Sequence, residues 1–206
     1  MTGSSLRAML SRPALEVAPA LLGGLLTTRR ADGRVTVRIT EVEAYEGERD
    51  PGSHAYRGQT ARNAVMFGRA GHLYVYRHLG LHHCVNLVCG PVGTASAVLL
   101  RAGEVVRGAE VALARRTAAG ACRSSVDLAR GPARLAVALG LDRTENGADV
   151  VARGGGVSLV LPSTPASDLA TGPRVGVSGL GGEVTRFPWR FWIAGDPTVS
   201  AYRRAP

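Results

Sequence analysis

Apolar and polar positions alternate along several short stretches of the chain, and this alternation predicts strands. Within residues 34–39, valine or isoleucine occupies every second position, and arginine or threonine occupies the positions between. A period of two is typical of a strand with one buried face. A strand is also expected over residues 25–30, after the Gly-Gly pair at 23–24, and the Asp-Gly pair at 32–33 provides a tight turn between the two strands. The chain therefore predicts a β-hairpin over residues 25–39.

The alternation changes after Thr40. If the strand continued without interruption, Glu41, Glu43 and Tyr45 would lie on the apolar face and Val42 on the opposite face. Either the strand contains a bulge at this point, or its carboxylates point inward. Inward carboxylates in a cleft are candidates for catalysis, so this segment is unusual under both interpretations.

The remaining pattern mixes helices and strands without regular βαβ alternation. It predicts one α+β domain over residues 1–206, with a curved antiparallel or mixed sheet flanked by helices and a protruding β-hairpin. The predicted helices cover residues 13–22 (kinked or broken before Pro19), a short helix from about 60 to 68, residues 108–116 and residues 131–139. Residues 52–62 read mostly as loop. The other predicted strands are a hairpin within 72–88, residues 97–101, a strand near Val150, and residues 157–161, 174–177 and 190–193.

Charge changes this picture by suggesting a partner. The chain has 25 Lys plus Arg, all of them arginine, against 16 Asp plus Glu, so its formal net charge is +9. Such an excess points to a polyanion, and nucleic acid is the first choice. A codon bias toward arginine would explain the missing lysine but not the excess of cations. Without lysine, side-chain Schiff-base chemistry is excluded, and only the terminal amine remains.

The cysteines and the apolar runs indicate where the protein works. Three cysteines without a C-x-x-C pair argue against a disulfide framework and for a reducing compartment. Residues 1–26 resemble a signal peptide only superficially, because Glu16 and Pro19 interrupt the apolar stretch, and a first helix is expected there instead. No apolar run reaches eighteen residues. We therefore expect a cytoplasmic, nucleoid-associated protein that does not contact membranes.

Histidines and cysteines gather between His78 and Cys89, which raises the alternative of a zinc site. The spacing weakens this alternative, since His82 and His83 would face opposite sides of a strand. Two alternative functions stay open at this point: a zinc-dependent nucleic-acid enzyme or binding module that uses this cluster, and a basic nucleic-acid-binding domain without catalysis.

Several ordered segments together resemble the alkyladenine (3-methyladenine, methylpurine) DNA glycosylase family. The resemblance extends from about residue 15 to residue 202. It is carried by residues 41–45, 53–63, 74–86, 99–102, 131–135, 174–177 and 188–191. A set of motifs in this order is far more specific than any one of them.

The resemblance implies a base-excision repair hydrolase that flips a damaged purine out of duplex DNA and cleaves its N-glycosidic bond with water. Glu43 would then be the catalytic carboxylate that activates the water. Arg101 would orient the same water or the phosphate of the flipped nucleotide. Because strand-nicking glycosylases commonly attack the sugar with an amine, the missing lysine predicts a monofunctional enzyme.

The same resemblance assigns a base pocket. Tyr45, His54 and Tyr76 would stack on a flipped, electron-poor alkylpurine, and Asn86 would lie at the pocket floor. The resemblance implies no metal and no cofactor, and it implies a monomer that binds double-stranded DNA.

The tip of the hairpin departs from the family pattern. Family members generally carry tyrosine where this chain has Leu79, the residue expected to wedge into the gap left by the flipped nucleotide. An apolar leucine can still serve as a wedge. His78 is the alternative residue for this role.

Overall fold

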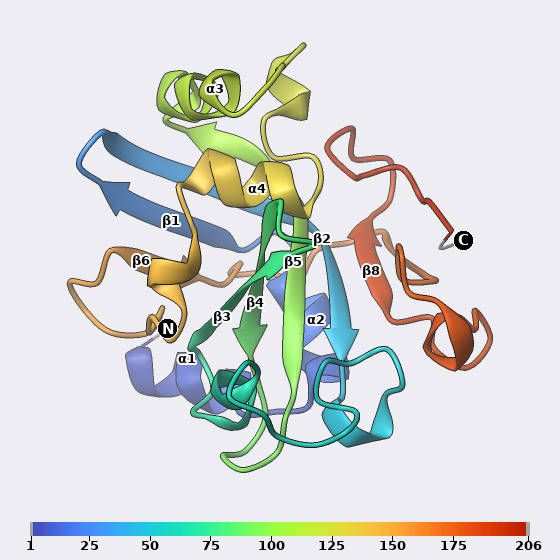
Figure 1. The fold of residues 1–206 in the computed structure, drawn as a ribbon. Coiled ribbons are helices and arrows are strands. Elements are labelled where there is room, and N and C mark those ends of the chain that lie inside the picture. Colours follow the sequence, from blue (N-terminus) through green and yellow to red (C-terminus); the bar gives the residue numbers. More distant parts are fainter. Residues whose placement is uncertain (1, 205–206) are drawn as a thin grey trace.

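The computed structural model describes residues 2–204, so residues 1, 205 and 206 of the expected domain lie outside the described part. As predicted, the fold is α+β, with one eight-stranded sheet (Figure 1). Every strand pairing in it is antiparallel, in the order β3-β4-β5-β2-β1-β6, with β7 and β8 joined to it through β2. The strands are β1 (Leu25–Arg30), β2 (Gly33–Tyr45), β3 (Leu73–His78), β4 (His82–Val88), β5 (Ala97–Arg107), β6 (Val157–Val160), β7 (Leu169–Gly172) and β8 (Arg190–Ile193).

Helices pack against this sheet. The α-helices are α1 (Gly3–Leu10), α2 (Ala14–Leu21), α3 (Ala109–Ala118) and α4 (Pro132–Leu139). In Figure 1, α4 crosses in front of the strands and α2 lies behind them; α2 packs on β2 and β5, and α4 on β4 and β5. Short 3-10 helices cover Gly47–Arg49, Ala64–Phe67, Ser125–Asp127, Arg143–Glu145 and Gly179–Gly182. None of the helices in residues 2–204 has the length and apolar character needed to cross a membrane.

The buried core joins helices that lie far apart in the sequence. Leu10 and Leu21 from the first two helices are fully buried in one cluster with Leu135 and Leu139 of α4 and with Ile39 of β2. Burying a leucine side chain contributes about 1.5–3 kcal/mol. The cluster therefore fixes the sheet against which the polar site is built.

Strand β2 shows both features that the sequence left open. Its register with β5 shifts between Ile39 and Glu41 and again between Glu41 and Val42, which marks a β-bulge or irregularity. Glu41 and Glu43 are also completely buried. Beyond the irregularity β2 pairs with β8 instead of β1. The two carboxylates therefore lie on a strand with partners on both sides.

Several local predictions need correction. Helix α2 continues through Pro19 without a break, and residues 64–67 form only a 3-10 turn. Residues 174–177 form no strand but a loop, and near Val150 there is only an isolated bridge between His72 and Asp149. In residues 174–177 the Val175 N–H donates to the Glu43 carboxylate, 132 positions away, and not to a neighbouring strand, a contact that no local pattern predicts.

The hairpin of β3 and β4 is confirmed, and its tip is exposed. Leu79 and Gly80 have φ angles of 48° and 70°, and the Leu81 N–H donates to the His78 carbonyl at 2.9 Å. Glycine adopts such angles freely, but a bulky side chain rarely does. Leu79 is 81% exposed, so no packing within residues 2–204 repays this backbone strain.

Candidate active site

A cavity of about 350 Å³ lies beside the carboxyl-terminal part of β2. This size is within the range of small-molecule sites. Its walls come from β2, the β3–β4 hairpin, β5, the start of α4 and two loops. The lining residues are Tyr45, Pro51, Gly52, Ser53, His54, Met66, Tyr74, Tyr76, His78, Cys84, Asn86, Leu99, Arg101, Pro132, Val175, Gly176, Val177 and Ser178.

The structure brings most of the predicted site residues together. Tyr45, His54, Tyr76, Asn86 and Arg101 all line this cavity. The other two predicted residues do not. Glu43 lies behind the wall, with a side chain that is fully buried, and Leu79 lies at the exposed hairpin tip.

Three aromatic side chains form one wall. The His54 ring meets the Tyr76 ring edge-on at 4.5 Å between centroids, and Tyr74 stacks on Tyr76 at 5.5 Å. His54 Nδ1 is 3.1 Å from the Tyr74 hydroxyl. Burial, followed by the charges of Arg62 and His78, lowers the pKa of His54 below 6.5. The wall is therefore uncharged at neutral pH and presents π faces.

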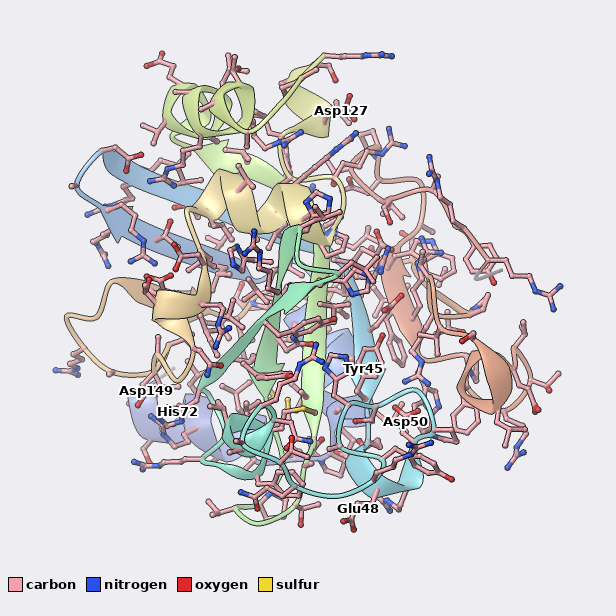
Figure 2. All side chains as sticks on the ribbon, in the orientation of Figure 1. Tyr45, Glu48, Asp50, His72, Asp127 and Asp149 are labelled. Atoms are coloured by element: carbon pink, nitrogen blue, oxygen red, sulfur yellow. The ribbon has the colours of Figure 1, made fainter. Side chains whose placement is uncertain are left out.

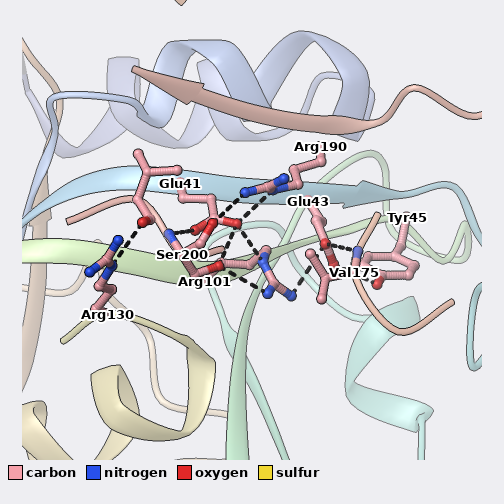
Figure 3. A network of polar contacts seen from close by, with 9 residues as sticks. Glu41, Glu43, Tyr45, Arg101, Arg130, Val175, Arg190 and Ser200 are labelled. Atoms are coloured by element: carbon pink, nitrogen blue, oxygen red, sulfur yellow. Dashed lines mark hydrogen bonds and ion pairs between the residues drawn. The ribbon is translucent and has the colours of Figure 1, made fainter. Parts of the chain in front are cut away.

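Glu43 is held by three residues of the cavity wall (Figure 3). Its Oε1 accepts the Val175 N–H at 2.7 Å and lies 3.2 Å from Arg101 Nη1. Its Oε2 accepts the Tyr45 hydroxyl at 2.9 Å. Burial and the neighbouring Glu43 charge raise the pKa of Tyr45 well above 10.0, so this hydroxyl remains a donor. The carboxylate is thus fixed directly behind the cavity wall.

Glu41 accepts more hydrogen bonds than Glu43 does. Its Oε1 accepts from Arg101 Nε at 2.8 Å and Arg190 Nε at 2.7 Å, and its Oε2 accepts from the Ser200 N–H at 2.7 Å. Burial alone would raise its pKa, but the two guanidiniums and the Ser200 hydrogen bonds hold the pKa below 4.5. Glu41 does not line the cavity.

Arg101 connects the two carboxylates. Burial opposes its charge, but Glu43 and Glu41 outweigh this effect and raise the pKa of the guanidinium further. Two arginines, Arg101 and Arg190, thus face two glutamates within one buried network (Figure 3). Because its charges balance, the network avoids the large cost of an unpaired buried ion.

Sequence reasoning missed the support beneath Tyr45. Arg174 lies 4.5 Å from the Tyr45 ring centroid, and its fork binds the Asp50 carboxylate at 2.6 and 2.7 Å. Figure 2 labels Tyr45 and Asp50 at this end of the sheet. A Cβ on Gly52 would lie 2.5 Å from the Arg174 guanidinium, so this close approach requires glycine. Arg174 and Asp50 are 124 positions apart in the chain, so no local pattern could have predicted their pairing.

Asn86 and Cys84 also line the cavity. The Asn86 amide nitrogen donates to the Tyr74 carbonyl at 3.1 Å, while its Oδ1 takes no hydrogen bond from residues 2–204. Burial raises the pKa of the Cys84 thiol, which disfavours a thiolate. Asn86 therefore keeps one acceptor for a ligand, and Cys84 acts as a small apolar surface.

The zinc alternative finds no support in the described residues. Between residues 2 and 204 no three His, Cys, Asp or Glu side chains are grouped as metal ligands would be. His78 and His82 lie opposite each other at the hairpin end, and Cys89 is completely buried in the core. The histidines and cysteines that are close in the sequence therefore do not form one set of metal ligands within residues 2–204.

Comparisons with known proteins agree with the motifs. Residues 8–197 match the methylpurine-DNA glycosylase family. A protein of Streptomyces avermitilis is 57% identical over 199 residues, which cover 96% of this chain and 91% of that protein. One of Leifsonia xyli subsp. xyli is 56% identical over 196 residues, which cover 93% and 89% of the two chains. Both carry the name "Putative 3-methyladenine DNA glycosylase". The chain therefore belongs to the methylpurine-DNA glycosylase family, a class of enzymes that hydrolyse N-glycosidic bonds in DNA.

Proposed function

We propose that this protein is a monofunctional DNA glycosylase that flips alkylated or deaminated purines into the cavity and releases them with a water activated by Glu43. The observation that carries the proposal is the position of Glu43. Its carboxylate is held by Tyr45, Arg101 and Val175, and all three line the cavity.

The reaction needs few groups. Water forms a bond to C1′ of the deoxyribose and gives its proton to Glu43, while the bond from C1′ to the purine nitrogen breaks and its electron pair leaves with the base. An alkylated purine is already a good leaving group, so the transition state resembles an oxocarbenium ion. A fixed carboxylate stabilises that positive charge and orients the water. Arg101 holds the carboxylate in place.

The aromatic rings that line the cavity support selection of damaged bases. Tyr45 and Tyr76 offer π faces that attract an electron-poor or cationic purine more than a normal base. Neutral His54 adds a third ring without adding a competing charge. The free acceptor of Asn86 gives the floor a group that can discriminate among purine edges.

Leu79 is proposed to fill the gap that flipping leaves in the duplex. Its exposed apolar side chain stands at the end of the hairpin that also forms the cavity wall. Strained backbone held at an exposed tip is typical of functional positions. The net charge of +9 supports duplex binding that weakens as salt increases.

The proposal is tested by incubating Glu43→Gln with methylated duplex DNA and measuring released bases. We expect excision to fall by about 10²–10⁴-fold, the usual worth of a positioned acid–base group, while duplex binding is retained. Glu48→Gln is the matched control, because Glu48 is exposed and close in sequence (Figure 2). Excision by Glu43→Gln at the wild-type rate would disprove the assignment.

Monofunctional action has its own test. A protein without lysine should leave the excised strand intact and form no adduct that borohydride traps. Strand cleavage accompanied by a trapped adduct would contradict the water mechanism.

A further inference from the structure

The chain returns to the catalytic network near its carboxyl end, at Ser200. We propose that Ser200 is a positioning residue for base excision, which orients Arg101 and thereby the Glu43 carboxylate. This inference rests on the proposed function, since it assumes that Glu43 activates the water.

Ser200 contacts the network through its backbone and its side chain. Its N–H donates to Glu41 Oε2 at 2.7 Å, and its hydroxyl donates to Glu41 Oε1 at 2.9 Å. The same hydroxyl oxygen accepts from Arg101 Nη2 at 3.3 Å. Arg190 Nη2 donates to the Ser200 carbonyl at 2.8 Å. One residue thus touches Glu41 and both arginines of the network (Figure 3).

The Ser200 hydroxyl contacts Nη2 of Arg101, the guanidinium nitrogen that neither carboxylate contacts. Glu41 holds Nε of Arg101, and Nη1 lies 3.2 Å from Glu43. Only Ser200 among residues 2–204 holds Nη2. Three fixed points define the plane of the guanidinium, and two leave it free to tilt. Tilting would change the contact with Glu43 first, because at 3.2 Å it is longer than the 2.8 Å contact of Arg101 with Glu41.

The segment that presents Ser200 is anchored without this hydroxyl. Thr198 Oγ1 is 2.8 Å from Thr40 Oγ1, and Arg130 Nε donates to the Val199 carbonyl at 3.0 Å. The Ser200 backbone contacts to Glu41 and Arg190 also survive removal of the side-chain oxygen. Ser200→Ala should therefore fold, so that a change in rate can be assigned to the hydroxyl.

The test compares Ser200→Ala, Ser200→Thr and Thr198→Ala with the wild type. Single-turnover excision from methylated duplex gives the rate of the chemical step, and titration with a duplex that carries an abasic-site analogue gives the dissociation constant. We expect Ser200→Ala to lower the excision rate roughly ten-fold, the usual worth of a hydrogen bond to a charged group. Its dissociation constant should stay within about two-fold of the wild type. Ser200→Thr keeps the hydroxyl and should recover most of the rate.

Thr198→Ala separates positioning from stability. Thr198 is buried in the same segment but contacts Thr40 and Asp196, not Arg101 or Glu41. Its loss should lower the melting temperature while the excision rate at 25 °C remains near that of the wild type. Equal losses of rate in Thr198→Ala and Ser200→Ala would show a merely structural role and overturn the inference.

The two proposals fail in different ways. Wild-type excision by Ser200→Ala, with excision abolished in Glu43→Gln, would refute the role of Ser200 alone. Normal excision by Glu43→Gln would refute the proposed function, and the inference about Ser200 would fall with it.

Discussion

The buried pair of Arg174 and Asp50 allows a direct test of how the segment that packs against the Tyr45 ring is stabilised. Neither side chain is exposed. Besides Asp50, the Arg174 guanidinium donates to the Ala44 carbonyl at 2.9 Å and the Gly181 carbonyl at 2.8 Å. Replacing Arg174 with methionine keeps an unbranched stem in this space but removes every one of these donors.

The magnitude follows from what remains after the change. Asp50 keeps hydrogen bonds from the Gly52 N–H at 2.9 Å and the Glu46 N–H at 3.3 Å, but its negative charge loses its counterion. Removing one partner of a buried pair costs about 3–5 kcal/mol. We expect Arg174→Met to lower the free energy of unfolding by an amount within this range. Such a decrease is a large share of the total stability of a domain.

Urea-induced unfolding, followed by far-ultraviolet circular dichroism at pH 7, measures this loss. Arg186→Met is the matched control. It lies in the same part of the chain, its side chain is 63% exposed, and its nearest carboxylate oxygen, on Glu183, is 3.8 Å away. An exposed ion pair contributes about 0–1 kcal/mol, so this control should change stability little.

The double variant Arg174→Met/Asp50→Asn isolates the interaction. With the unpaired charge also removed, it should be less destabilised than the sum of the two single variants, by about 0.5–3 kcal/mol. Two results would refute the reasoning that the charge pair stabilises this segment. One is a decrease of less than about 1 kcal/mol in the free energy of unfolding of Arg174→Met, and the other is strict additivity of the two single variants.

Three further predictions concern pH and the hairpin. The pKa of Glu41 in the folded protein is held below 4.5, so the stability that this carboxylate contributes is complete above pH 4.5 and is lost as pH falls through the folded pKa. Glu41→Gln should therefore reduce the slope of stability against pH in acid, and an unchanged slope would contradict this prediction. The titration midpoint of the His54 imidazole, measured by NMR, should lie below pH 6.5, and Arg62→Gln should raise it. A wild-type midpoint at or above 6.5 would show that burial does not govern the pKa of His54. Leu79→Gly should keep the free energy of unfolding within about 1 kcal/mol of the wild type, since glycine accepts the φ of 48°. It should lower excision from duplex DNA roughly ten-fold, and normal excision would exclude a wedge at this position.

Local patterns in the chain predicted much of the framework. The Asp-Gly turn and the alternation after it correctly predicted the hairpin of β1 and β2, and the Gly-Pro pair at 131–132 correctly marked the start of α4. The break in alternation after Thr40 directed attention to Glu41 and Glu43, which proved to be buried on an irregular strand. These features depend on neighbours within a few positions, so a single sequence contains them.

Only the tertiary structure decided how the two carboxylates differ. Along the chain, Glu41 and Glu43 occupy equivalent positions on one face of a strand. In space, Glu41 is enclosed by two arginines and by Ser200, 159 positions away, while Glu43 meets the wall of the cavity and the Val175 N–H, 132 positions away. The energy of a buried charge depends on which groups surround it, and those groups are brought there by the pairing of β2 with β5 and β8. The sequence by itself, through its motifs and their resemblance to the family, pointed to candidate residues and to the chemistry they favour, and the fold determined which groups surround each of the two carboxylates.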